Sequence, residues 1–272
     1  MNKVTVIGIM GNSVFLPVER FHVGGETVEA SDAHFELGGK GFNQAVAAAR
    51  FGADVTFVAA VGQDDAVQFE AFLRKEGITA KLCPKTTATA FAAIVTDKAG
   101  ANHVTVFQGA QLSVSDIQNM EKAIREADIL LLNNEVDEKV NLCAAQIAKR
   151  NAVQIILNPA PQRPSDSSLL DAVSWFTPNE HEGEGLEGYS NVIKTLGERG
   201  CFLKSENRIV PSVKVQAVDT TGAGDTFNGV LAAELALGQS LEQAVGTAIR
   251  ASGNSVTKKG AVSSIPYRNE LL

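Results

Sequence analysis

The stretch of residues 219–229 holds the residue types best suited to chemistry. It reads Asp-Thr-Thr-Gly-Ala-Gly-Asp-Thr-Phe-Asn-Gly and leads directly into a helical pattern of apolar residues. Small residues allow backbone N–H groups to converge on a ligand, and the unpaired N–H groups of a helix start favour an anion. We therefore expect Gly222, Ala223 and Gly224 to form an anion hole for a phosphoryl group.

Asp225 follows this turn directly, and two roles are open to it. A carboxylate at a helix start normally caps the helix, which is the simpler interpretation. Because an anion hole precedes it and a second acid, Asp219, lies upstream, Asp225 can instead face a substrate hydroxyl beside an incoming phosphoryl group. A general base for phosphoryl transfer needs that position.

A second glycine-rich stretch, Gly38-Gly-Lys-Gly-Phe-Asn-Gln-Ala45, opens a helix that ends near Phe51-Gly-Ala53. Together with residues 219–229 it resembles the two signatures of the ribokinase family, the phosphofructokinase-B type of carbohydrate kinases. The resemblance covers about residues 4–266. It implies a kinase that transfers phosphate from ATP to a hydroxyl of a sugar or sugar-like small molecule, with magnesium as cofactor and Asp225 as the base.

The same resemblance implies that the substrate contacts Gly39, Lys40, Asn43 and Asp219. Simpler interpretations exist: glycines before a helix can be a flexible turn, a lone lysine is usually solvated, and an Asp that opens a glycine-rich turn often only forms it. Glu135 follows the apolar run 129–132, and the carboxyl ends of parallel strands present ligand contacts. Glu135 can equally cap the next helix, but the resemblance favours substrate contact.

The residues expected to bind the nucleotide are assigned from the family resemblance alone. Thr177-Pro-Asn-Glu-His-Glu182 resembles the family's Asn-x-x-Glu element, with Asn179 at the phosphates and Glu182 acting indirectly on magnesium. Thr195-Leu-Gly-Glu-Arg-Gly200 resembles the loop that borders the nucleotide, which implicates Thr195, Gly197 and Gly200. Solvated acids and an ordinary turn after a strand are the simpler alternatives.

The tail of residues 255–264 resembles the family loop that binds a monovalent cation, expected here to be potassium. The positions that carry over as its ligands are Asp219, Thr221, Ser255, Lys258, Gly260 and Ser264.

The chain departs from the family pattern in two places. Where ribokinases carry Asn-x-Asp, whose Asp holds sugar hydroxyls, this chain has Gly11 and Ser13. A serine offers a sugar one neutral partner in place of a carboxylate, so we expect Ser13 to contact a substrate other than ribose. Only twelve residues separate Glu182 from Thr195, so a helical layer is expected to be trimmed on the nucleotide side.

Two other function classes remain open. A catalytically weak protein of the same fold that binds or senses a sugar or nucleoside fits the missing acid at Ser13 and the short segment after Glu182, whereas the intact Asp225 argues against it. A nucleotide-binding dehydrogenase is a weaker alternative, because Gly8 and Gly11 after the first strand lack the spacing of GxGxxG.

Apolar runs of strand length alternate with helical patterns, which predicts a single α/β domain over residues 1–272 around a mainly parallel sheet. The resemblance specifies a three-layer ribokinase-like sandwich with a small β-sheet lid. Segments of about 12–36 and 83–107 break the alternation and are expected to form this lid, through which a homodimer is possible. The expected strands of the main sheet are 4–9, 55–61, 129–132, 153–157, 175–177 and 192–196.

Two helix starts carry a capping box, in which a serine and a side chain three residues later each bond the other's backbone. We expect one from Ser115 to Gln118 and one from Ser240 to Gln243.

Composition excludes several partners. The net charge of −7, without a cluster of lysine and arginine, argues against nucleic acid. No apolar stretch approaches the roughly 20 residues that span a bilayer, so no membrane contact is expected. The three cysteines, Cys83, Cys143 and Cys201, lack CxxC spacing and are expected to be reduced thiols in the cytoplasm.

Overall fold

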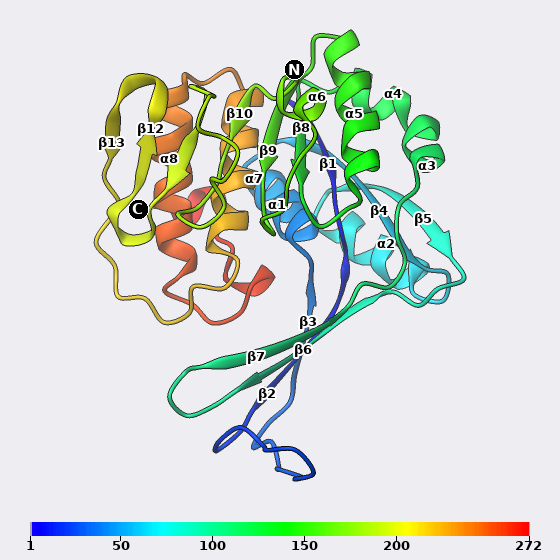
Figure 1. Ribbon diagram of the computed structural model, residues 1–272, viewed down its shortest axis with the longest axis vertical. Helices are drawn as coiled ribbons and strands as arrows, with labels where there is room; N and C mark the ends of the chain where they lie inside the picture. Colours follow the sequence, from blue (N-terminus) through cyan, green and yellow to red (C-terminus); the bar gives the residue numbers. More distant parts are fainter. Residues whose placement is uncertain (1, 272) are drawn as a thin grey trace.

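The computed structural model describes residues 2–271, and its centre is a sheet of six strands (Figure 1). Their order across the sheet is β10, β9, β8, β1, β4 and β5, and every neighbouring pair is parallel. The strands are β1 (Lys3–Ile7), β4 (Asp54–Gly62), β5 (Thr79–Lys85), β8 (Ile129–Asn133), β9 (Gln154–Asn158) and β10 (Trp175–Phe176). The predicted mainly parallel sheet is confirmed.

Strands that are apolar on both faces need helices on both sides. In β4, Val55 and Phe57 belong to one core, while Val58 and Ala60 belong to the other. The first core is closed by α1 (Lys40–Arg50), α2 (Ala66–Lys75), α7 (Ala223–Ala236) and α8 (Leu241–Ser255). The second is closed by α3 (Val114–Asn119), α4 (Glu121–Arg125), α5 (Glu138–Arg150) and α6 (Ser167–Leu170). The three layers agree with the predicted sandwich.

Within residues 2–271, the helices are all too short or too polar to cross a membrane.

A second sheet, here called the projecting sheet, extends away from the three layers (Figure 1). Its strands lie in the order β3 (His34–Gly38), β2 (Gly11–Pro17), β6 (Ala90–Thr96) and β7 (Asn102–Phe107). The pair β2 and β6 is parallel, and the other two pairs are antiparallel. Residues 83–85, expected in the lid, instead pair with β4 as the end of β5.

The run 192–196 was wrongly predicted as a strand of the main sheet. It lies in a third, antiparallel sheet made of β11 (Ile193–Thr195), β12 (Cys201–Leu203) and β13 (Arg208–Val210). A single bridge between Phe176 and Val192 joins it to the main sheet. The error has a physical reason, because a short buried apolar run has the same pattern in a parallel and an antiparallel sheet.

No helix connects β10 to β11 in the part of the chain that the structure describes. The connecting loop covers the edge strand with its own side chains. Leu186 is buried, and the Tyr189 ring lies 5.1 Å from the ring of Phe176. Lys204 holds the loop by donating to the Leu186 carbonyl at 3.2 Å. The short segment of residues 183–194 is therefore a packed loop without a helix.

One of the two predicted capping boxes is present. Ser240 and Gln243 cap α8 reciprocally, as expected. The box predicted from Ser115 to Gln118 is wrong, because α3 is capped by Ser113 and Asp116. The Asp116 carboxylate also forms an ion pair with Lys85 of β5 at 2.7 Å. The neutral side chain of Gln118 cannot form such an ion pair.

Candidate active site

Asp225 lies in the first turn of α7 without capping it. The helix begins after Gly222, whose φ of 74° is in the left-handed region that favours glycine, and no side chain caps it. Asp225 is only 7% exposed. Its Oδ2 accepts a hydrogen bond from the Asn43 amide at 2.9 Å, and its Oδ1 accepts one from the Gln44 amide at 3.1 Å. The simpler interpretation of Asp225 as a helix cap is not supported.

Helix α1 supplies both amides because it packs closely against α7. A Cβ on Gly229 would lie 2.2 Å from the Gln44 carbonyl oxygen, so the helices approach at the level of their backbones. At the start of α1, Gly39 has a φ of 111°, and a Cβ there would lie 2.3 Å from the Ile9 carbonyl oxygen. The glycines before α1 therefore have a packing role beyond that of a flexible turn.

Lys40, Glu135 and Glu182 lie within electrostatic reach of Asp225. Burial raises the pKa of Asp225, while the positive charge of Lys40 and the hydrogen bonds from the two amides oppose this. In return, the Asp225 charge raises the pKa of Lys40, and the two glutamates add to that effect. Lys40 is therefore a partner of buried acids rather than a solvated surface lysine.

Glu135 ties this cluster to the start of α1. Its Oε2 accepts a hydrogen bond from the Lys40 backbone N–H at 2.8 Å. Burial raises the pKa of Glu135 to about 7; the Asp225 charge adds to the shift and Lys40 opposes it. Helix α5 is capped by Asp137, so the alternative role of Glu135 as its cap is not supported.

A cavity of about 940 Å³ opens between the projecting sheet and the carboxyl ends of the main-sheet strands. Among the predicted substrate residues, Ser13, Gly39, Lys40 and Glu135 line it. Asn43 is not among the lining residues, since it is buried against Asp225.

A smaller cavity of about 290 Å³ brings together all four predicted nucleotide residues. Its lining includes Asn179, Thr195, Gly197 and Gly200, together with Ala223 and Gly224. These two belong to the turn of residues 222–224, here called the anion-hole turn after its predicted role. Residues from three separate stretches thus meet at the start of α7. Asp225 directly follows Gly224 of the smaller cavity and lies within electrostatic reach of Lys40, which lines the larger one.

Asp219 joins the anion-hole turn to the C-terminal loop instead of lining the larger cavity. Its Oδ1 accepts hydrogen bonds from the Thr221 N–H at 2.9 Å and hydroxyl at 2.7 Å, and its Oδ2 accepts one from the Gly260 N–H at 3.0 Å. Burial acts to raise the pKa of Asp219, but these hydrogen bonds prevail and the pKa lies below its usual value. Asp219 is therefore both a turn former and a charged anchor for the loop.

The other predicted cation ligands follow the same loop. The Ser255 hydroxyl donates to the Ser252 carbonyl at 2.8 Å, and the Ser264 hydroxyl donates to the Ala261 carbonyl at 2.9 Å. The Lys258 amino group points to Glu270, at 3.7 Å. Only the backbone carbonyl of Lys258 is thus suited to a cation.

Sequence reasoning missed two residues of this site. Gln44 belongs to the first glycine-rich signature, which predicts no role for it, although its side-chain amide donates a hydrogen bond to Asp225 as that of Asn43 does. Asn134 lines the larger cavity, is 2% exposed, and has no hydrogen-bond partner for either side-chain amide atom within residues 2–271. The available signal for Asn134 was its place between the end of the apolar run 129–132 and the predicted substrate residue Glu135.

Comparison with known proteins adds an independent line of observation. The family model described as pfkB family carbohydrate kinase matches residues 1–268. The chain belongs to this family.

Relatives of this pfkB-family chain match it over nearly its full length. A ribokinase of Haemophilus influenzae is 36% identical over 99% of this chain and 97% of its own. The crystal structure of ribokinase from Thermotoga maritima has a TM-score of 0.91 and 34% identity, covering 100% of this chain and 98% of its own. An Arabidopsis thaliana ribokinase, solved in complex with ribose and ATP, has a TM-score of 0.85 and 26% identity, covering 99% and 97%.

As a pfkB-family member, the chain is a carbohydrate kinase, which phosphorylates a hydroxyl of a sugar or sugar-like small molecule with ATP as donor. The predicted family, fold class and type of enzyme are confirmed. These relatives are kinases by name, so the sensor and dehydrogenase alternatives gain no support.

We expect Glu135 to make the stability of the fold depend on pH. Its pKa rises from 4.5 to about 7 on folding, so the folded protein binds this proton more tightly. The resulting stabilisation is complete below the unfolded pKa and is lost as the pH rises through the folded pKa. The melting temperature of the wild type should therefore fall, relative to that of Glu135→Gln, between about pH 5 and pH 8.

Thermal melting of both proteins at closely spaced pH values measures this difference. The variant Glu70→Gln, which removes an exposed carboxylate from α2, is the matched control. Parallel pH profiles for the wild type and Glu135→Gln would contradict the prediction.

Proposed function

We propose that Asp225 is the general base of the phosphoryl transfer. It accepts the proton of a sugar hydroxyl while the hydroxyl oxygen bonds to the γ-phosphorus of ATP and the bond from that phosphorus to ADP breaks. The observation that carries this proposal is a buried carboxylate at a helix start that caps nothing, held by two neutral amides beside Lys40. Burial raises its pKa, which strengthens it as a base.

The backbone turn of Gly222, Ala223 and Gly224 is proposed as the anion hole. The Ala223 N–H donates to the Thr220 carbonyl at 3.3 Å. Within residues 2–271, the N–H groups of Gly224 and Asp225 donate no hydrogen bond. Free donors at the positive end of α7 suit the negative charge that develops on the transferring phosphoryl group.

The larger cavity is assigned to the sugar or nucleoside. Lys40 and Glu135 offer it charged groups, Ser13 a hydroxyl, and Gly39 its backbone. Asn43 lies outside the lining of this cavity and is retained as a substrate contact on family resemblance, although its side-chain amide oxygen has no partner in the described part of the chain. Asp219 is retained as a substrate contact on family resemblance only.

We add Asn134 to these contacts, because an unpaired buried amide is costly until a ligand satisfies it. The volume of about 940 Å³ lies near the upper end for small-molecule sites, which supports a substrate bulkier than a pentose.

The smaller cavity is assigned to the nucleotide, through Asn179, Thr195, Gly197 and Gly200. Glu182 is proposed to act indirectly on magnesium. Its Oε2 accepts a hydrogen bond from the Asn179 N–H at 3.0 Å, and its charge reaches Lys40 and Asp225, so the residues present fit a hydrated cation beside the phosphates. Magnesium bound with ATP neutralises charge on the phosphate oxygens.

Assembly and location are proposed on separate grounds. The projecting sheet exposes large apolar side chains at Phe35, Val104 and Phe107, between 52% and 71% exposed, which supports a homodimer through this sheet. Sedimentation equilibrium tests for this homodimer.

The free thiols Cys83, Cys143 and Cys201 and the use of ATP support a cytoplasmic location.

Potassium is expected to activate the enzyme. The loop offers the ionised Asp219, backbone carbonyls and the Ser264 hydroxyl, an oxygen donor set that fits a monovalent cation. A bound cation adds positive potential near the anion hole. Initial rates should be higher in potassium than in tetramethylammonium buffer at equal ionic strength, and equal rates would contradict the assignment.

Asp225→Asn is expected to lower kcat by at least about a hundredfold, the low end for loss of a general base. Sugar affinity should change little. Because burial raises the pKa of Asp225, its charge is held at a cost, and the neutral variant should melt at the same temperature or higher. Steady-state rates, calorimetric sugar binding and thermal melting check all three. A folded variant with near wild-type turnover would exclude Asp225 as the base.

Ser13→Asp is expected to raise kcat/KM for ribose by about tenfold, because a carboxylate accepts two charge-assisted hydrogen bonds where serine offers one neutral hydroxyl. In the wild type, another sugar or nucleoside should exceed ribose. The control Ala99→Asp adds the same charge in the exposed turn between β6 and β7. If wild-type protein prefers ribose to every compound in a broad panel, the assignment of Ser13 is wrong.

A further inference from the structure

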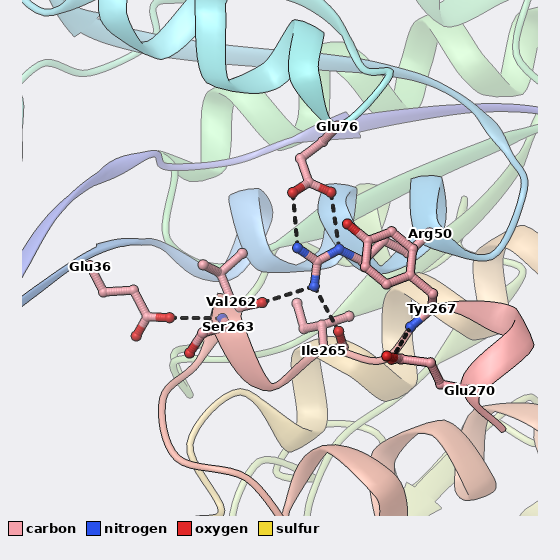
Figure 2. Close-up of polar contacts among 8 residues, drawn as sticks. All are labelled: Glu36, Arg50, Glu76, Val262, Ser263, Ile265, Tyr267 and Glu270. Atoms are coloured by element: carbon pink, nitrogen blue, oxygen red, sulfur yellow. Dashed lines mark hydrogen bonds and ion pairs between the residues drawn. The ribbon is translucent and has the colours of Figure 1, made fainter. Parts of the chain in front are cut away.

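Glu36 belongs to β3 of the projecting sheet, yet its side chain ends on the C-terminal loop. Its Oε1 accepts a hydrogen bond from the Ser263 N–H at 2.8 Å (Figure 2), and its Oε2 accepts one from the Ala261 N–H at 3.1 Å. Hydrogen bonds to an ionised carboxylate are about twice as strong as those between neutral groups. The projecting sheet is thus bonded directly to a loop distant in the sequence.

The loop of residues 260–265 supports the turn that we assign to the phosphoryl group. The Gly260 N–H donates to the Asp219 carboxylate at 3.0 Å. Ala261 packs on Gly222, where a Cβ would lie 3.3 Å from the Ala261 Cα. A displacement of Gly260 and Ala261 therefore removes support from Gly222, where the anion-hole turn begins, and from Asp219 in the segment before it.

Carbonyl groups of the same loop are bonded to the main body, independently of the projecting sheet (Figure 2). Nη1 of Arg50 donates to the carbonyls of Val262 at 3.1 Å and Ile265 at 2.6 Å. Its Nε and Nη2 donate to Glu76 at 3.0 and 2.9 Å, and both side chains of this ion pair are 10% exposed. The Glu36 carboxylate is the contact through which the projecting sheet acts on the N–H groups of Ala261 and Ser263.

The strand pair that carries Glu36 also carries a wall of the larger cavity. Ser13 of β2 and Glu36 of β3 lie directly opposite each other in an antiparallel pair, so their side chains share one face of the projecting sheet. Ser13 lines the cavity. A substrate that contacts this face acts on the same strands that hold the loop.

We propose that Glu36 is a positioning residue, which ties the projecting sheet over the sugar cavity to the loop that supports the anion hole. Glu36 acts through Gly260 and Ala261 and touches no reacting atom. The proposal rests on the proposed function of Gly222 and Asp225 in phosphoryl transfer.

Glu36→Ala and Glu36→Gln test this link, with Asp97→Ala as a matched control. Asp97 lies in the turn between β6 and β7 of the same sheet, where its Oδ1 accepts hydrogen bonds from the N–H groups of Ala99 at 2.9 Å and Ala101 at 3.0 Å. The variant Asp97→Ala therefore loses the same kind of hydrogen bond, from backbone N–H groups to a carboxylate, without affecting the loop of residues 260–265.

In Glu36→Ala, kcat is expected to fall about tenfold, while the calorimetric Kd for the sugar changes less than about twofold, because reacting groups are displaced and sugar contacts are kept. Amide hydrogen exchange at Ala261 and Ser263 should become at least about tenfold faster. Glu36→Gln, which can accept one of the two hydrogen bonds, should lie between Glu36→Ala and the wild type. Asp97→Ala should match the wild type in kcat, sugar affinity and loop exchange.

Unchanged exchange at Ala261 and Ser263 in Glu36→Ala would overturn the link itself. Faster exchange with wild-type kcat, or an equal loss of kcat in Asp97→Ala, would overturn its positioning role. If Glu36→Ala does not fold, Glu36→Gln carries the same comparison. Absence of turnover in the wild type would instead refute the proposed function, whereas the exchange measurement needs no turnover and still supports or overturns the link.

Discussion

The site is organised around a buried carboxylate. A charged Asp225 at the core of the fold is unfavourable unless other groups compensate it, and the chain does so with two amides of α1 and the charge of Lys40. These partners arrive together because α1 presses against α7 where Gly229 leaves room for the Gln44 carbonyl. A side chain at position 229 would separate the helices and leave the carboxylate without partners.

This requirement links the parts of the molecule that surround Asp225. Helix α1 starts where β3 of the projecting sheet ends, so the segment that compensates Asp225 also supplies Gly39 and Lys40 to the lining of the larger cavity, which we propose for the sugar. The turn before Asp225 is braced by Asp219 and the C-terminal loop, and Arg50 fixes that loop to α1 as well. The larger cavity, the turn before Asp225 and the C-terminal loop thus share one helix as their common support.

The sequence was most informative where local pattern and chemistry coincide. Apolar runs predicted five of the six main-sheet strands, and two glycine-rich signatures located the turn before Asp225 and the start of α1. Pattern failed where tertiary contacts decide: β5 was missed because residues 79–85 alternate weakly, and 192–196 was placed in the wrong sheet. The four residues predicted to bind the nucleotide line one cavity, although no single stretch of sequence indicates that they meet.

The contacts of Glu36 and Arg50 could not be predicted from the sequence for a related reason. Each joins a side chain to backbone groups more than two hundred positions away, and backbone atoms carry no sequence signal. Gln44 and Asn134 are intermediate cases. The sequence shows that both residues lie beside a predicted motif. It does not show where their side chains point, because that depends on how the helix or the strand end is turned in the fold.

The central claim, that this chain is a phosphoryl-transferring enzyme acting on a sugar or nucleoside, is tested most directly by ADP release with a panel of pentoses, hexoses, their phosphates and nucleosides, with each product identified by mass. We predict that at least one compound raises ADP release well above the rate with ATP alone and gains one phosphoryl group per ADP formed. Sugar or nucleoside binding without any compound-dependent ADP release would contradict the account and favour a sensor of the same fold.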